Sequence, residues 1–279
     1  MPELPEVEVS RMGLLPHLEG QRLVAAIVRR ADLRLPIPQD LHARLAGHRL
    51  AALERRGKYL LFHWPTAGGW LILHLGMSGS LRLVAPDAPL GKHDHLELVF
   101  PDTVMRFSDP RRFGLVTWQT GEDAQAHPLL AALGIEPLTK ALTPDWLADK
   151  VKGRKQPIKQ FLMDARIVVG IGNIYAAESL FRAGISPLAP AGSLGPEHLR
   201  ALVAAIRETL REAIDAGGSS VRDYVHSDGG AGSFQLRCAV YGRAGQACPR
   251  CGTTIRQIRQ AGRSSFYCPK CQKPADGAR

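Results

Sequence analysis

The sequence has few cysteines and no long hydrophobic run. Only 5 of its 279 residues are cysteine, which is too few for the disulfide framework of a small secreted protein. The most apolar stretch, residues 70–75, is interrupted by His74 and is far shorter than the roughly 20 residues that cross a bilayer. The first residues lack the basic and apolar regions of a secretion signal. We therefore expect a cytoplasmic protein without membrane segments.

Acidic residues are scarce relative to basic ones. The chain has 36 Lys and Arg against 26 Asp and Glu, a net charge of +10. Residues 238–279 hold eight basic residues and one acidic residue, a concentration that favours nucleic acid as a partner. A disordered basic tail is the alternative, but such tails seldom contain residues like Phe266 and Tyr267.

Four of the five cysteines form two closely spaced pairs that are separated by sixteen residues: Cys248, Cys251, Cys268 and Cys271. This spacing is typical of a ribbon that holds one tetrahedral Zn²⁺ through four thiolates. Four thiolates leave the metal no open position, so we predict a structural role for the zinc. Arg263 lies between the pairs, where a guanidinium group suits phosphate recognition. Cys238 is left over and is expected to be a small core residue.

The hydrophobic pattern divides the chain into a β-rich part and an α-rich part. Short apolar runs between Gly, Pro and Asp predict strands, at residues 22–28, 59–62, 70–75, 81–84, 96–100 and 114–118. These strands indicate a β-sandwich or barrel, preceded by a short helix that Pro16 is expected to end. Helices are predicted in the second part, at residues 144–151, 157–165, 173–183 and 196–216. The glycine- and serine-rich residues 217–234 are typical of a functional loop.

Pro2 is a candidate nucleophile. A small second residue normally allows the initiator methionine to be removed, which would leave proline as a free secondary amine. An α-amino group has an unperturbed pKa of about 7.7 to 8.0, so a sizeable fraction is unprotonated at neutral pH and can attack an electrophilic carbon. A secondary amine would form a charged iminium, and the adjacent Glu3 could transfer protons. Taken alone, proline after methionine is mostly a matter of processing.

Seven separated motifs occur in one order along nearly the whole chain: PELPEVE (2–8), RRGKYL (55–60), HLGMSGS (74–80), KHDH (92–95), DPRRFG (109–114), GIGNIYA (170–176) and GRSSFYCP (262–269). With them the chain closely resembles the formamidopyrimidine-DNA glycosylases, bacterial enzymes that repair oxidised guanine.

The resemblance implies an α+β fold with two domains and DNA lying across the cleft between them. We expect a β-sandwich with an N-terminal helix over residues 2–132, a linker at 133–143, a helix-two-turns-helix domain at 144–234 and a zinc ribbon at 235–279. Residues 217–234 would form a lid over the everted base. The partner would be double-stranded DNA with oxidised purines or abasic sites, bound by a monomer.

The resemblance also implies roles for individual residues. Pro2 would attack C1′ of the damaged nucleotide and displace the base, and its iminium would promote β- and δ-elimination. Glu3 matches the family's proton-transfer carboxylate, Lys58 a proton donor in β-elimination, and Arg263 a phosphate clamp and proton donor in δ-elimination. Met77, Arg111 and Phe113 match the side chains that enter the duplex when the nucleotide turns out. Further DNA contacts are expected from His74, His93, Lys159, Asn173 and Tyr241. Lid contacts are expected from Ser219, Ser220, Val221, Arg222 and Tyr224.

Simpler interpretations stand beside these. Met77 and Phe113 are residue types that are usually buried, Asn173 could cap the helix that follows it, and Lys58 could be a solvated lysine. His95 stays unassigned, and no carboxylate pair accompanies the histidines to suggest a second metal site.

Two rival functions remain open. One is an endonuclease VIII-like glycosylase for oxidised pyrimidines, although Leu4 stands where that group usually has glycine, and the loop at 217–234 is long. The other is a zinc-ribbon protein that binds distorted duplex without catalysis and therefore needs no free Pro2 amine.

Overall fold

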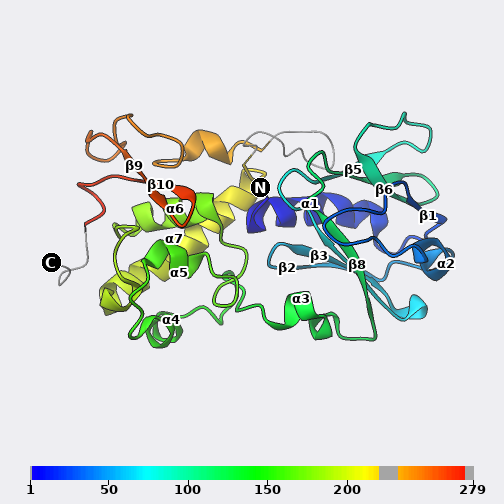
Figure 1. Ribbon diagram of the computed structural model, residues 1–279, viewed down its shortest axis with the longest axis horizontal. Coiled ribbons are helices and arrows are strands. Elements are labelled where there is room, and N and C mark those ends of the chain that lie inside the picture. Colours follow the sequence, from blue (N-terminus) through cyan, green and yellow to red (C-terminus); the bar gives the residue numbers. More distant parts are fainter. Residues whose placement is uncertain (1, 220–231, 274–279) are drawn as a thin grey trace. The chain divides into compact units, whose positions relative to one another are not determined.

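The computed structural model describes residues 2–219 and 232–273 of the chain, whose backbone is drawn in Figure 1. Its contacts divide it into two compact units. Of the described residues, the first unit combines 2–132 with 214–219 and 232–235, and the second combines 133–213 with 236–273. The sequence-based division instead placed 133–143 in a linker and 217–234 with the helices. The segment predicted as a linker is hydrogen-bonded within the second unit, where Gly134 N donates to Ala165 O at 2.8 Å.

The first unit contains two four-stranded antiparallel sheets. One sheet has the order β1-β6-β7-β5 and the other the order β2-β3-β4-β8. The strands are β1 (Ala25–Val28), β2 (Ala52–Arg56), β3 (Tyr59–Trp64), β4 (Gly69–His74), β5 (Ser80–Val84), β6 (Asp94–Val99), β7 (Val104–Ser108) and β8 (Leu115–Thr120). Leucines and aromatic residues from both sheets share one core, which confirms the predicted sandwich.

Helix α1 (Leu4–Leu18) packs against β2 and β3, and the short α2 (Leu41–Leu45) lies against β1. Pro16 lies inside α1, so the expectation that it ends the helix is wrong. Proline removes one hydrogen bond, here to the carbonyl of Met12, which is an exposed residue that water can reach. The helix continues because Leu14 and Leu18, on either side of Pro16, are fully buried in the core.

The second unit is mainly helical. It contains α4 (Pro144–Val151), α5 (Ile158–Leu162), α6 (Asn173–Arg182) and most of α7 (Pro196–Asp215), while α3 (Pro128–Ala131) belongs to the first unit. Buried leucine, isoleucine and valine residues line one face of α7, as the sequence pattern predicted. Gly217 follows that helix with a φ of 75°, and its N–H donates to Ile214 O. A left-handed glycine one residue beyond the C-cap position of a helix is a favourable way to end it.

A two-stranded hairpin follows the helices. Strands β9 (Arg256–Gln260) and β10 (Arg263–Tyr267) pair antiparallel. Phe266 of β10 packs against a small core that contains Ala177 and Phe181 of α6 together with Val240, Ile255 and the cysteines. The hairpin is therefore fixed to the helices by its own small core.

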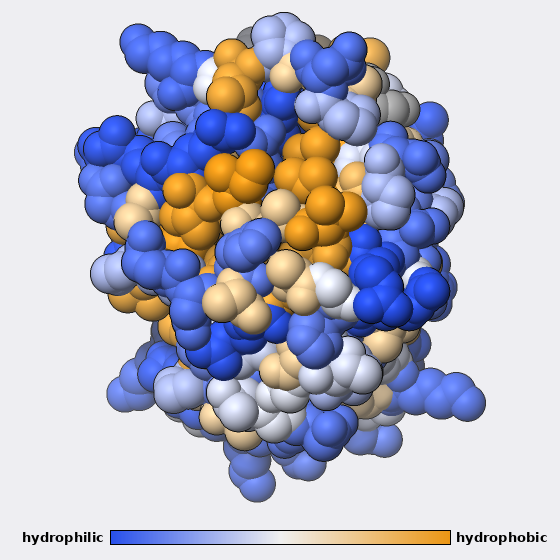
Figure 2. Space-filling model, turned by 90° about the vertical axis from the view of Figure 1, so that its right-hand side faces the viewer, coloured by the Kyte–Doolittle hydropathy of each residue, from blue (hydrophilic) through white to orange (hydrophobic). Residues whose placement is uncertain are grey.

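The surface is mostly polar, with local exceptions. Figure 2 shows one face on which hydrophobic residues form a patch surrounded by hydrophilic ones. Within the first unit, Val24, Ile27, Leu35 and Leu90 are large exposed hydrophobic residues. Among the described residues, no helix is both long and apolar enough to cross a membrane.

Candidate active site and nucleic-acid interface

Pro2 and Glu3 lie at the start of helix α1. Both are buried, with Glu3 only 2% exposed, and Glu3 is the residue that precedes the first helical turn. Its backbone N–H donates to Glu6 Oε2 at 2.8 Å, which fixes the direction in which the chain enters the helix. The candidate nucleophile and its carboxylate neighbour are thus held at the positive end of a helix dipole.

The base of the predicted lid is anchored to the same helix. Ser219 N donates to the other carboxylate oxygen of Glu6 at 2.7 Å, and Ser219 bridges to Ser233. Glu6 therefore connects the N-terminus of α1 to the first residues of the loop. Of the five lid candidates only Ser219 can be placed, because Ser220, Val221, Arg222 and Tyr224 lie outside the described residues.

Lys58 and His74 lie at one end of the sheet that contains β3 and β4. Lys58 follows Gly57 in the two-residue turn between β2 and β3, and Gly57 has a φ of 57°. A glycine in the first position is what a type II′ hairpin turn requires. Tyr59 is paired with His74 across β3 and β4, and their rings are 4.8 Å apart. Lys58 is partly exposed, and its positive charge acts on His74.

His74 is a neutral hydrogen-bond donor in this environment. Burial, together with the charges of Lys58 and Arg34, lowers its pKa to about 4. Its Nδ1 accepts a hydrogen bond from Gly76 N at 2.9 Å, so the proton of the neutral ring is on Nε2. A neutral imidazole with its proton on Nε2 can donate to a phosphate oxygen without adding charge.

We predict that this histidine makes stability depend on pH. The unfolded chain binds a proton below about pH 6.5 whereas the folded protein binds it only near pH 4, so stability rises with pH across that window and is complete above it. Urea unfolding of the wild type and of His74→Gln at about pH 7 and pH 4.5 measures the difference. The wild type should lose about 2 to 3 kcal/mol more than the variant on acidification. Equal losses would show that His74 is not the group responsible.

The three candidates for entering a duplex lie on turns, and their side chains are exposed. Met77 is 37% exposed and Phe113 is 46% exposed, so the interpretation of both as core residues is wrong. Arg111 is also exposed, and its guanidinium carbon lies 5.0 Å from the centre of the Phe113 ring. Exposed Met and Phe beside an arginine can contact apolar and hydrogen-bonding groups together.

Basic residues surround a pocket of about 340 Å³ next to these turns. Its lining includes Lys92, His93, Arg112 and the buried Asp94. His93 therefore belongs to a positively charged surface. His95 is buried and donates from Nε2 to the carbonyl of Asp109 at 2.8 Å, which gives this unassigned residue a structural role.

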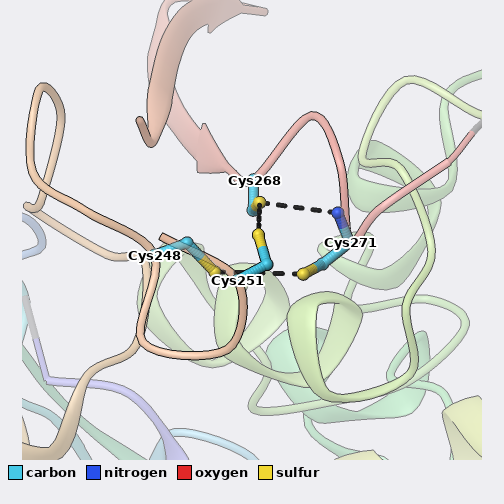
Figure 3. A group of neighbouring side chains, drawn as sticks. All are labelled: Cys248, Cys251, Cys268 and Cys271. Atoms are coloured by element: carbon cyan, nitrogen blue, oxygen red, sulfur yellow. Dashed lines mark hydrogen bonds between the residues drawn. The ribbon is translucent and has the colours of Figure 1, made fainter. Parts of the chain in front are cut away.

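The cysteine cluster predicted from the spacing is assembled in the second unit. Figure 3 shows the four side chains converging: Cys248, Cys251, Cys268 and Cys271. Their sulfur atoms all lie within 4.8 Å of one another, and the separation is 3.9 Å between Cys248 and Cys271 and 3.5 Å between Cys251 and Cys268. A tetrahedral zinc with bonds of about 2.3 Å places its sulfurs about 3.8 Å apart. The residues therefore fit one structural Zn²⁺, and Cys238 is buried and does not belong to the cluster.

The thiols of this cluster cannot all ionise at neutral pH without a cation. Hydrogen bonding by Thr253 lowers the pKa of Cys251 to about 6, whereas burial raises the pKa of Cys271 to about 12. A divalent metal replaces the protons and compensates the charge of four adjacent thiolates.

Arg263 is the first residue after the hairpin turn. The two turn residues, Ala261 and Gly262, have φ values of 45° and 78°. Positive φ at both positions is the requirement of a type I′ turn, which matches the twist of the strands that it joins. Arg263 pairs with Gln260 and is exposed, so its guanidinium group is presented at the tip of the hairpin.

Lys159 and Asn173 connect the helices to this hairpin. Lys159 is 2% exposed, and its Nζ donates to Asn173 Oδ1 at 2.6 Å and to Ser265 Oγ at 2.6 Å. Both Lys159 Nζ and Asn173 Nδ2 donate to Ser264 O at 3.1 Å. A direct contact of Lys159 with DNA would need an exposed ammonium group, whereas here the lysine holds Asn173 beside β10.

Asn173 does not cap helix α6, because Gly172 is the capping residue and Asn173 is the first residue within the helix. The capping interpretation is therefore wrong. The Asn173 side chain instead lies next to the residue that follows Arg263. The two phosphate-contact candidates of the second unit are thus held at one place.

Tyr241 is fixed by a buried carboxylate on α6. Glu178 is 1% exposed and accepts hydrogen bonds from the backbone N–H groups of Ala239, Val240 and Tyr241, at 2.8 to 3.0 Å. The Tyr241 ring packs edge-on against Phe266 of β10 at 5.2 Å. Sequence reasoning did not identify Glu178, since a glutamate in a helix gives no indication of burial.

Comparisons with known proteins agree with this arrangement. The sequence model of the formamidopyrimidine-DNA glycosylase N-terminal domain matches residues 1–116, that of the H2TH domain of the same enzymes matches 133–225, and a zinc finger found in FPG and IleRS matches 245–274. The formamidopyrimidine-DNA glycosylase of Dechloromonas aromatica is 58% identical over 276 residues, which cover 98% of this chain and 100% of the relative. This chain belongs to the formamidopyrimidine-DNA glycosylase family.

Solved structures extend the likeness to the fold. The MutM (FPG) protein of Thermus thermophilus is 40% identical, with a TM-score of 0.85 over 98% of this chain and 99% of that one. A mutant Lactococcus lactis FPG, in complex with DNA containing Fapy-dG, is 35% identical, with a TM-score of 0.90 over 98% and 100%. The predicted fold, the structural zinc and the enzyme class, a DNA base-excision repair glycosylase, are confirmed.

Family membership favours a glycosylase over a zinc-ribbon protein that only binds DNA, because a curated glycosylase matches along its whole length.

One basic residue escaped the sequence reasoning. Arg34 is exposed, donates its backbone N–H to Gly114 O at 3.2 Å and places its charge near His74. Its local sequence has no motif that could have identified it.

Proposed function

We propose that this protein removes oxidised purines from duplex DNA with the Pro2 amine as its nucleophile and then cuts the abasic strand. The observation that carries the proposal is the burial of Pro2 and Glu3 together at the N-terminus of α1. Once Met1 is removed, the Pro2 nitrogen is a secondary amine at the positive end of a helix dipole. That position disfavours a positive charge and so favours the free base that attacks carbon.

The reaction then follows from the amine. The nitrogen lone pair forms a bond to C1′ of the damaged nucleotide, and the bond from C1′ to the base breaks, with Glu3 transferring protons. Loss of the base leaves Pro2 bonded to C1′ of the closed sugar. The nitrogen loses its proton, its lone pair breaks the C1′–O4′ bond, and O4′ takes up a proton, which leaves an iminium between Pro2 and the opened sugar. This electron sink acidifies the adjacent C2′–H, and loss of that proton expels the 3′ phosphate. A second elimination expels the 5′ phosphate. Lys58 and Arg263 are assigned as proton donors in the β- and δ-eliminations.

Extrusion of the damaged nucleotide leaves a gap in the base stack and an unpaired opposite base, and protein side chains have to take the place of the lost contacts. Met77 would fill the gap in the base stack, Arg111 would hydrogen-bond the unpaired opposite base, and Phe113 would wedge the neighbouring step. The exposure of all three side chains supports this assignment. Phosphate contacts are assigned to His74, His93, Arg263 and Asn173, and a contact near the zinc ribbon to Tyr241.

Oxidised purines are the proposed substrate class, and abasic sites should also be cleaved. The similar Lactococcus lactis protein in complex with Fapy-dG DNA supports a purine lesion. The partner is a damaged duplex without two-fold symmetry, which suits a monomer. We place the protein in the cytoplasm, where a bacterial chromosome is accessible.

Borohydride trapping tests the nucleophile directly. The protein is incubated with a duplex that contains one 8-oxoguanine, the iminium is reduced, and the linked peptide is identified by mass spectrometry. A stable adduct on Pro2, in a chain that lacks Met1, is expected. An adduct on a lysine would overturn the assignment of the nucleophile, and no adduct would favour a protein that only binds. A matched duplex with an oxidised pyrimidine tests the remaining rival, since faster excision there would reverse the proposed preference.

A further inference from the structure

A single buried carboxylate lies between the two turns that carry Met77, Arg111 and Phe113. Asp109 is 0% exposed. Its Oδ1 accepts from Ser78 Oγ at 2.6 Å, in the turn of Met77. Its Oδ2 accepts from Gly114 N at 2.7 Å, directly after Phe113. One side chain thus bonds to both turns.

The backbone N–H of Arg111 belongs to the same hydrogen-bond network. Arg111 N lies 3.3 Å from Asp109 Oδ1 and 3.2 Å from Ser78 Oγ, so the two acceptors share its hydrogen. The Ser78 hydroxyl therefore donates to one partner and accepts from another, which orients it fully. Buried hydrogen bonds to a charged acceptor are stronger than those between neutral groups.

The backbone of Asp109 fixes this carboxylate to the sheet. Asp109 N donates to His93 O at 3.0 Å, and Asp109 O accepts from His95 Nε2 at 2.8 Å and from Arg112 N at 3.2 Å. His93 and His95 flank the first residue of β6. The carboxylate is consequently a fixed point to which two turns are attached.

The two turns also touch each other without spare room. A Cβ on Gly76, whose φ is 66°, would lie 2.4 Å from the Phe113 carbonyl carbon and 2.5 Å from Gly114 N. Arg112 has a φ of 57° although it is not glycine. Non-glycine residues keep such a conformation only where their surroundings hold it. The contacts that hold Arg112 include its own bond to Asp109.

We propose that Asp109 is a positioning residue that joins the two turns into one rigid unit, so that Met77, Arg111 and Phe113 enter the duplex together. The inference rests on the proposed role of these three side chains in extrusion. Groups that are held in their final arrangement before binding lose little freedom when they insert. Two independent turns would each have to be ordered during insertion. A displacement of an inserting group by about 1 Å can cost on the order of 100-fold in rate.

The first test needs no DNA. Asp109→Asn replaces one acceptor oxygen with a donor, and Ser78→Ala removes the link to the Met77 turn with a smaller change. Trypsin can cleave after Arg111 or Arg112 only when their turn opens, so native-state cleavage there reports the opening equilibrium. We expect cleavage in Asp109→Asn to be at least about tenfold faster. The control is Asp102→Asn, at an exposed aspartate in another turn. Wild-type cleavage rates in Asp109→Asn would overturn the proposal.

The second test measures extrusion on a duplex with 2-aminopurine beside 8-oxoguanine. Stopped-flow fluorescence should show unstacking about 10- to 100-fold slower in Asp109→Asn, with a smaller loss in Ser78→Ala and none in Asp102→Asn. Phe113→Ala should also be slow. The double variant Asp109→Asn with Phe113→Ala should be about as slow as the slower single variant, because both changes impair the same step, the insertion of Phe113.

The outcomes distinguish failure of the proposed insertion from failure of the coupling by Asp109. If Phe113→Ala and Met77→Ala extrude the nucleotide at the wild-type rate, the proposed insertion itself is wrong. If they are slow while Asp109→Asn and Ser78→Ala are not, only the coupling by Asp109 is wrong. In the double variant the two reductions in extrusion rate could instead multiply. If they do, and if the melting temperature falls and tryptic cleavage rises throughout the chain, Asp109 has a general folding role and the inference is overturned.

Discussion

Replacement of Pro2 by glycine, or of Glu3 by glutamine, is expected to abolish base excision while binding to damaged duplex survives. Glycine leaves a primary amine on an unrestrained backbone, whereas proline supplies a secondary amine whose ring fixes its direction. Complete loss of a nucleophile can cost on the order of 10⁴-fold or more in kcat, and the misdirected primary amine of glycine should cause most of that loss. Glutamine keeps the shape of Glu3 but cannot transfer protons, for which a loss of about 10² to 10⁴-fold is typical.

Single-turnover excision from an 8-oxoguanine duplex measures both effects, and a gel-shift titration measures binding. Glu19→Gln is the matched control, because Glu19 is an exposed glutamate that follows the other end of α1. It should excise at the wild-type rate. Unchanged excision in the Pro2 or Glu3 variant would refute the assigned chemistry. If binding and excision fall by the same factor, these residues contribute to DNA binding, and the excision rate alone does not establish a chemical role for them.

Removal of one zinc ligand is expected to act on binding to all DNA. Cys251→Ser leaves three thiolates, and the free energy of zinc coordination that stabilises the ribbon is largely lost. The hairpin that presents Arg263 would then be disordered, along with its bonds to Lys159 and Asn173. Affinity for undamaged and damaged duplex should fall alike, by at least about tenfold, and the salt dependence of binding should weaken because fewer phosphates are contacted.

Cys238→Ser is the matched control, because Cys238 is buried but lies outside the cluster. It should keep one zinc per chain and bind DNA as the wild type does. Zinc content by elemental analysis and affinity at two salt concentrations are measured on both variants. If Cys251→Ser loses zinc but binds DNA normally, the ribbon is not the phosphate clamp.

The secondary structure was predictable where the pattern is simple. Helix α7 and most strands of the sandwich follow from the periodicity of their apolar residues. Strand β7 was missed because Arg106 interrupts the pattern, and that side chain is buried against Glu97 at 2.7 Å. Strand β2 was missed because it is an edge strand with three charged residues. A buried ion pair or an edge position cannot be inferred from local hydrophobicity.

The sequence by itself determined the chemistry that depends on residue type and short spacing: four cysteines for zinc, a proline after methionine, and motifs that place the chain in its family. Only the tertiary structure decided which side chains are exposed and which are buried. Met77 and Phe113 face solvent, while Lys159, Glu178 and Asp109 are buried hubs of hydrogen bonds. The physical reason is that the partners of these hubs lie on other turns and elements, brought close by packing, so nothing in the neighbouring residues specifies them.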